Sequence, residues 1–139
     1  MHFDLVDRVL EIGPGRIVTI KHVSAAEEYL QDHFATFPVL PGVLMLEAMV
    51  QAARRLIESR GAAAPMVLGK VRALKYGRFV QPGSTLRVEV TLHKDLAGGE
   101  FDFKGEGVAV EPTGEQGVAV SGRFVLRPLR LGPPAGRGG

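Results

Sequence analysis

The sequence contains no cysteine, and its positive and negative charges nearly balance. The absence of cysteine excludes disulfide bonds, thiolate nucleophiles and cysteine-ligated zinc or iron–sulfur centres, and it favours a cytoplasmic location. Lysine and arginine number 17 against 15 aspartate and glutamate residues, so the net charge is +2. This small excess predicts no nucleic-acid partner, although it suits contact with an acidic protein.

Long apolar runs are also missing. The most apolar stretch, Val39 to Val50, is too short to cross a bilayer, which needs about 20 residues, so we expect no membrane contact. Met1 to Leu10 carries two aspartates and lacks the basic-then-apolar order of a secretory signal. The length predicts one domain, which we place at residues 1–128. We expect residues 129–139, rich in Gly and Pro, to form a disordered tail.

The spacing of apolar residues predicts one long helix and about five strands. The long helix runs from Val43 to about Arg60, contains no internal Gly or Pro, and precedes Gly61, which favours helix termination. Leu86 to Lys94 alternates apolar and polar residues, as half-buried strands do. The predicted strands are 16–23, 66–74, 86–94, 101–110 and 118–126, and a short helix is predicted over 25–31.

The long helix is apolar nearly all round, which means that most of its sides must be covered. Short turns join the later strands and imply antiparallel pairing. We therefore predict an α+β fold in which a curved antiparallel sheet of five to six strands wraps around one long central helix.

Two polar residues interrupt the apolar part of the predicted helix. Glu47 and Gln51 lie four positions apart, so they share one face and can touch. Burial favours the neutral form of a carboxyl group, which would make Glu47 a proton donor, held in one orientation by Gln51. A second interpretation stays open, in which both residues lie on a solvated stripe of the helix.

His33 precedes this helix and Gly42 stands at its start. Histidine exchanges protons near neutral pH, and Pro38 and Pro41 restrict the loop that holds His33. The Gly42 N–H has no intrahelical acceptor, and glycine allows a ligand close to the backbone. A base, an acid and a hydrogen-bond donor suit removal of a proton beside a thioester carbonyl with loss of a β-hydroxyl group, a reaction that needs no metal.

The run HFATFPVLPGVLMLEAMVQAA, His33 to Ala53, resembles the G-H-F-P-G-x-P-x-x-P-G-V-L-x-x-E-A-M-A-Q motif of the hot-dog-fold β-hydroxyacyl-(acyl carrier protein) dehydratases. Weaker similarity to this family covers Phe3 to Ile12 and Val71 to Ser84. The acid is Glu rather than Asp, which resembles the FabZ-like branch that does not isomerise the double bond. The resemblance implies the hot-dog fold and conversion of a (3R)-3-hydroxyacyl thioester to the trans-2-enoyl thioester.

The resemblance also implies roles for individual residues. His33 would take the C2 proton, Glu47 would protonate the leaving hydroxyl group, and the Gly42 N–H would bind the thioester carbonyl. Gln51 and Asp32 would support them. No cofactor is implied, since the acyl chain is carried on the phosphopantetheine arm of acyl carrier protein or coenzyme A. The family pattern implies a homodimer whose active sites each combine the histidine of one subunit with the acid of the other, and it leaves a hexamer built as a trimer of dimers open.

Two further sets of residues are candidates for contact with substrate and carrier. The acyl-tunnel candidates are Phe34, Phe37, Val43 and Leu46. The candidates for binding an acidic carrier are Arg54, Arg55, Lys70, Arg72, Lys75 and Arg78, for each of which ordinary solvated surface charge is the alternative.

The sequence departs from the family motif at Asp32, at Ala35-Thr36 in place of Pro-Gly, and at Phe37. These departures put the family's usual substrate, from fatty acid synthesis, in question, and they leave a specialised role in polyketide, polyene or other secondary lipid synthesis open beside it. Two alternative functions also remain open. A hot-dog thioesterase would use the carboxylate to activate water and would leave His33 without a clear role. A non-catalytic acyl-thioester binding module, or an inactive partner subunit, is kept open by the loop departures.

Overall fold

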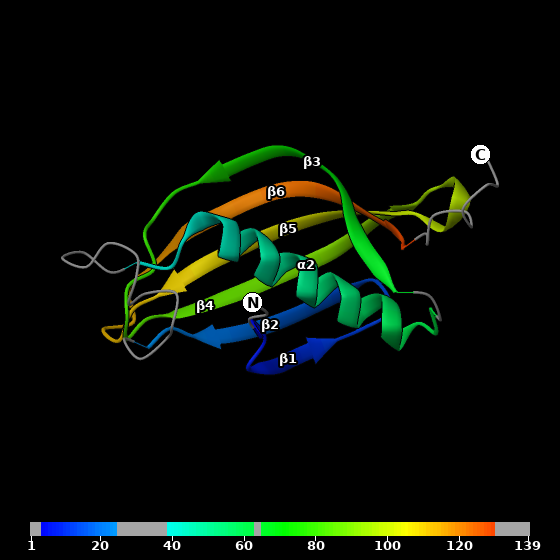
Figure 1. Cartoon of the computed structure of the whole chain (residues 1–139). Coiled ribbons are helices and arrows are strands. Elements are labelled where there is room, and N and C mark those ends of the chain that lie inside the picture. The colour runs from blue at the N-terminus through cyan, green and yellow to red at the C-terminus, as the bar shows by residue number, and fades with distance from the viewer. Residues whose placement is uncertain (1–3, 25–38, 63–64, 130–139) are drawn as a thin grey trace, which may run out of the picture.

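The computed structural model describes residues 4–24, 39–62 and 65–129. The predicted helix over 25–31 and residues 130–139 of the predicted tail lie outside these ranges. The elements of the described part, drawn in Figure 1, are β1 (Arg8–Ile12), β2 (Arg16–His22), α2 (Gly42–Ser59), β3 (Met66–Tyr76), β4 (Thr85–Asp95), a 3-10 turn η1 (Ala97–Gly99), β5 (Phe101–Val110) and β6 (Gln116–Pro128).

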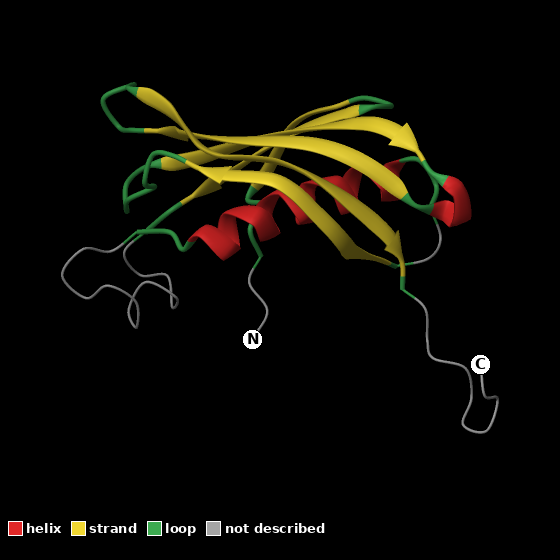
Figure 2. Cartoon of the chain, turned by 90° about the horizontal axis from the view of Figure 1, so that it is seen from above, coloured by secondary structure: helices red, strands yellow, loops and turns green. Residues whose placement is uncertain are grey.

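All six strands form one antiparallel sheet in the order β1-β2-β4-β5-β6-β3. Figure 2 shows that this sheet is curved and that α2 lies along one of its faces. The α+β hot-dog prediction is thereby confirmed. The apolar pattern did not predict β1 as a strand, because most of its residues are exposed and it carries little alternation to read.

The predicted elements form for the reasons that their patterns suggested. On β4, Leu86, Val88 and Val90 are fully buried, and the polar residues between them remain partly exposed. Helix α2 ends at Ser59, Arg60 is its C-cap residue, and Gly61 then adopts a left-handed φ of 91°. The Gly61 N–H then donates to the Glu58 carbonyl (3.0 Å) and the Ala62 N–H to the Ile57 carbonyl (3.2 Å), the paired bonds of a glycine-terminated helix.

Helix α2 packs closely on the middle of the sheet. Its buried face is rich in small side chains, among them Ala48, Ala52 and Ala53, and a Cβ on Gly105 of β5 would lie only 2.7 Å from the Met49 sulfur. Glycine at this position therefore lets the helix and the sheet approach each other. On the neighbouring strands β5 and β6, the buried Phe103 and Phe124 rings stack with centroids 5.4 Å apart.

One expectation about the helix is wrong for the single chain. The sheet covers one side of α2, whereas the apolar composition predicted cover on most sides. Val43 is 68% exposed, and Leu44 and Leu46 are only partly buried. The described sheet curves around one face of the helix only, so an apolar surface remains open. No helix in the described ranges is long and apolar enough to span a membrane.

Candidate active site

Glu47 and Gln51 touch on the outer side of α2, as their spacing predicted. The Gln51 amide nitrogen donates to Glu47 Oε2 at 3.0 Å. The Gln51 carbonyl oxygen in turn accepts a hydrogen bond from the backbone N–H of Leu5 at 2.8 Å. Since a backbone N–H can only donate, it selects the amide orientation in which the NH₂ group faces Glu47. The Leu5 backbone N–H thus fixes the direction of two consecutive hydrogen bonds, the second of which ends on the Glu47 carboxyl group.

Arg54 adds a positive charge to the same oxygen of Glu47. Its guanidinium Nη1 lies 3.7 Å from Glu47 Oε2, while its Nε donates to the Met66 carbonyl at 2.9 Å. Among the described residues, Glu47 Oε1 receives no hydrogen bond. Within the described ranges, one carboxyl oxygen is thus held by the protein and the other is not engaged.

The burial predicted for Glu47 is not reached within one chain. Its side chain is 36% exposed and that of Arg54 is 32% exposed. Val43, Glu47, Gln51 and Glu58 follow one another along the side of α2 that the sheet does not cover. For an isolated chain, the interpretation of a solvated stripe therefore describes these residues better than a buried acid does.

The two hydrogen bonds of Gln51 predict that its replacement lowers both folding stability and kcat, and that the two effects can be separated. A Gln51→Leu variant would leave the buried Leu5 N–H without its acceptor, which costs about 1–3 kcal/mol, and would release Glu47, which can lower kcat by up to about 10²-fold. Gln51→Glu retains an acceptor for Leu5 but places a second carboxyl group beside Glu47. We expect Gln51→Glu to keep more of the thermal stability than Gln51→Leu while shifting the pH dependence of kcat, as melting curves and pH profiles would measure. Equal melting temperatures and equal kcat in all three proteins would contradict the assignment.

An apolar cavity of about 430 Å³ opens at the start of α2. Its lining includes the predicted residues Gly42 and Val43, and the first bond of the helix runs from Leu44 N–H to the Pro41 carbonyl, so the Gly42 N–H lies before the intrahelical ladder. Glu47 does not line this cavity, but it lies four residues after Val43 on the same side of the helix. The structure thus brings Glu47 and Gln51 together and places Gly42 about one helical turn away.

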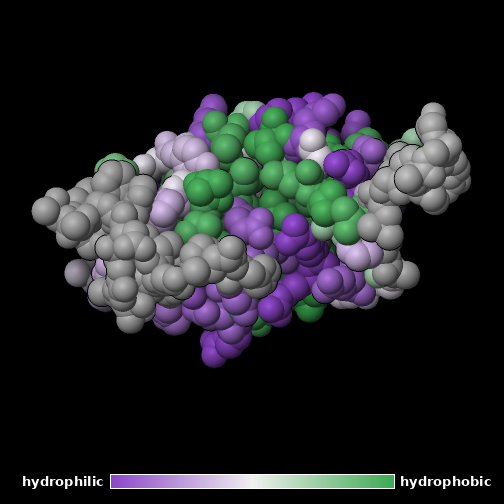
Figure 3. All heavy atoms as spheres, viewed as in Figure 1, coloured by the Kyte–Doolittle hydropathy of each residue, from purple (hydrophilic) through white to green (hydrophobic). Residues whose placement is uncertain are grey.

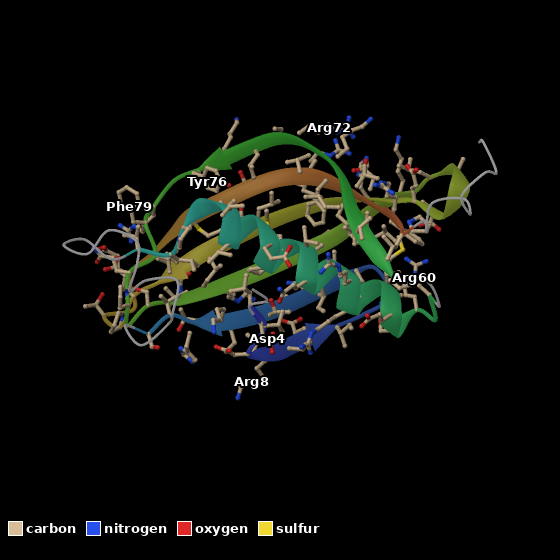
Figure 4. All side chains as sticks on the ribbon, in the orientation of Figure 1. Asp4, Arg8, Arg60, Arg72, Tyr76 and Phe79 are labelled. Atoms are coloured by element: carbon tan, nitrogen blue, oxygen red, sulfur yellow. The ribbon has the colours of Figure 1, made fainter. Side chains whose placement is uncertain are left out.

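Sequence reasoning missed two aromatic residues of the cavity. Tyr76 and Phe79 line it together with Met45, and they are 50% and 62% exposed. Figure 4 shows Tyr76 at the end of β3 beside the start of α2, with Phe79 further out and Arg60 at the opposite end of the helix. The available signal was the sequence YGRF, in which two aromatic residues lie between a strand and the turn that begins at Gln81.

Five of the predicted site residues are not among those that the structure places at the cavity or beside Glu47. His33, Asp32, Phe34 and Phe37 lie outside the described residues. Val39 and Leu40, which precede α2, line the cavity. Leu46 is half-buried but is not part of the cavity lining, so the predicted tunnel set is only partly brought together.

The six basic candidates separate into two groups. Arg54 contacts Glu47, Arg72 lies 3.2 Å from the buried Asp102 carboxylate, and Arg78 pairs with Glu111 and Glu115 at 2.9 and 3.2 Å. These three have partners within the fold, which favours a structural role. Arg55, Lys70 and Lys75 are exposed and form no ion pair with another described residue.

The chain is similar in sequence to FabA-like domains and to FabZ dehydratases. A family model described as a FabA-like domain matches residues 1–108. The 3-hydroxyacyl-[acyl-carrier-protein] dehydratase FabZ of Pelotomaculum thermopropionicum is 48% identical over 97 residues, which cover 66% of this chain and 68% of that protein. Further relatives of the same name are 38–46% identical.

Solved structures share the fold. An acyl-CoA hydrolase from Bacillus cereus has a TM-score of 0.66 at 17% identity, covering 84% of this chain and 67% of that chain. The dehydratase heterocomplex ApeI:P from Xenorhabdus doucetiae has a TM-score of 0.65 at 16% identity, covering 91% of this chain and 99% of that chain. At such identities the likeness concerns the fold alone.

Proposed function

The chain belongs to the FabA-like family, and from this membership we propose that it removes water from a 3-hydroxyacyl group carried by acyl carrier protein. One observation of the site carries the proposal. The Glu47 carboxyl group accepts a hydrogen bond from the Gln51 amide, which the Leu5 backbone N–H orients in turn, and it lies one helical turn from an apolar cavity that begins at Gly42. An apolar cavity suits an acyl chain, and an oriented carboxyl group suits proton transfer.

In the proposed reaction, His33 takes the proton from C2 and Glu47 gives a proton to the C3 hydroxyl group. The C3–O bond breaks, the C2–H electron pair forms the C2=C3 double bond, and water leaves. The negative charge that develops on the thioester oxygen is bound by the Gly42 N–H. The Glu47 carboxylate that remains is stabilised by the Gln51 hydrogen bond and by the Arg54 guanidinium.

A homodimer would complete the site. Figure 3 shows apolar side chains gathered between α2 and β3, on the face that the sheet leaves open. Strand β3 is also a terminal strand of the sheet, and among the described strands it pairs with β6 alone. A second subunit placed there would cover Val43 and remove Glu47 from water, which the single chain does not do. Assembly of such dimers into a hexamer remains a prediction.

The same proposal includes a binding surface for the carrier protein and a class of acyl substrate. Arg55, Lys70 and Lys75 are the basic residues left for an acidic carrier protein, since the other three candidates have partners in the fold. The departures at Asp32, Ala35-Thr36 and Phe37 support an acyl substrate from polyketide or other specialised lipid synthesis in the cytoplasm. The chemistry proposed needs no metal or other cofactor.

Hydration of a 2-enoyl thioester, the reverse reaction, tests the proposal directly. We expect the purified protein alone to remove the ultraviolet absorbance of the conjugated thioester. Rates measured with acyl chains of several lengths, on carrier protein and on coenzyme A, would define the substrate. His33→Ala should abolish hydration. Retained hydrolysis of the thioester by this variant would support a thioesterase instead. Hydration only in the presence of a co-expressed homologue would support a partner subunit.

A further inference from the structure

The Tyr76 ring lies against the backbone at the start of α2. A Cβ built on Gly42 would be 2.9 Å from both Cε1 and Cζ of Tyr76 and 3.3 Å from its hydroxyl oxygen. A side chain at position 42 would therefore collide with the ring, and the hydroxyl end of the ring lies close to Gly42. Tyr76 reaches this place from the end of β3, a strand distant in sequence, so that two elements meet at one point of the cavity.

Within the part of the chain that the structure describes, the Tyr76 hydroxyl is not engaged by another group and faces the cavity. It forms no hydrogen bond with any described residue, and it lies in a lining that is mostly apolar. The other polar side chain of this lining, Arg78, is engaged by Glu111 and Glu115. A phenol is protonated at neutral pH, and partial burial raises the pKa of Tyr76 further, so its hydroxyl can donate a hydrogen bond.

We propose that the Tyr76 hydroxyl donates a second hydrogen bond to the thioester carbonyl oxygen, beside the one from the Gly42 N–H. This assignment rests on the proposed dehydratase function, because charge develops on that oxygen when the C2 proton leaves. A fixed donor aimed at developing charge lowers the barrier without giving up its own proton. Position 42 is then glycine for a reason beyond backbone approach, since only glycine lets the phenol lie next to the bound oxygen.

Packing is the competing explanation, because the same ring covers the start of the helix. Tyr76→Phe separates the two roles, since it keeps the ring and removes only the hydroxyl oxygen. If the hydroxyl binds the developing oxyanion, kcat for enoyl-thioester hydration should fall by about 10²–10³-fold while KM changes little. Phe79→Leu is the matched control, because it alters the apolar lining of the cavity without removing a donor; its effect should fall on KM and acyl length.

A binding measurement provides a readout that packing would not change. A saturated acyl thioester and the matching thioether, which has a methylene group in place of the carbonyl, differ at the atom that Tyr76 would contact. We expect calorimetry to show that the wild-type protein prefers the thioester and that Tyr76→Phe reduces this preference. An active wild-type protein whose Tyr76→Phe variant keeps kcat within about twofold and the same preference would overturn the role of Tyr76 and leave the proposed function intact. An inactive wild-type protein would overturn both.

Discussion

Replacing Glu47 with glutamine is expected to lower kcat/KM for enoyl-thioester hydration by about 10²–10⁴-fold. The amide has the shape of the carboxyl group, and its oxygen can still accept the hydrogen bond that Gln51 donates at 3.0 Å. It has no proton to exchange with the substrate at the working pH, so only the acid–base contribution is removed. Initial rates of absorbance loss with one fixed enoyl thioester would measure the change.

Glu58→Gln provides the control for this variant. Glu58 lies on the same helix, is exposed, and has the same side chain. The Glu47–Arg54 pair is about one-third exposed on both sides, so its loss should cost at most about 1 kcal/mol of folding free energy. We therefore expect both variants to fold with similar melting temperatures and only Glu47→Gln to lose activity. If Glu47→Gln kept more than about a tenth of the wild-type rate, another group would have to supply the proton.

Mixing two inactive variants is expected to restore about a quarter of the wild-type activity per subunit. His33→Ala and Glu47→Gln each damage one member of the acid–base pair. If each site takes histidine from one subunit and the acid from the other, a mixed dimer contains one intact site and one site that lacks both groups. After random exchange of equal amounts, about half of the dimers are mixed, and one site in two is intact in these. Rates measured before and after exchange would show the recovery.

Each variant incubated alone provides the baseline for this experiment. A mixture of His33→Ala with Glu58→Gln shows the rate expected when one parent is active. Exchange itself can be followed with differently tagged subunits. Demonstrated exchange without any recovery would mean that His33 and Glu47 of the same chain form each site, and the shared dimer site would be wrong.

The strongest local patterns predicted the fold well. The strict alternation of Leu86, Val88 and Val90 depends only on neighbouring residues, and it became β4 with those side chains in the core. Both ends of the long helix were predicted to within about one residue. The prolines before it and Gly61 after it are local signals for where a helix starts and stops. In contrast, β1 was not predicted, since a mostly exposed edge strand leaves little apolar pattern.

The candidate site was predicted where its parts lie on one element. The four-residue spacing of Glu47 and Gln51 was enough to predict their contact, because the helix fixes which side chains are neighbours. The spacing did not predict that the Leu5 backbone holds the Gln51 amide, since that bond joins segments 46 residues apart. The sequence also left the surroundings of Glu47 open between burial and a solvated stripe, because residue composition does not say which side of a helix its own sheet covers.

The sequence by itself determined which residues form the helix, which faces are apolar, and which groups can exchange protons, since these depend on residue type and short-range spacing. Only the tertiary structure decided that Tyr76 lies against Gly42, that Arg72 and Arg78 are engaged by carboxylates, and that one side of α2 stays open. These contacts arise from the curvature and pairing of a sheet whose strands are far apart in the chain. No local pattern encodes that geometry, because it is set by how the whole sheet packs on the helix.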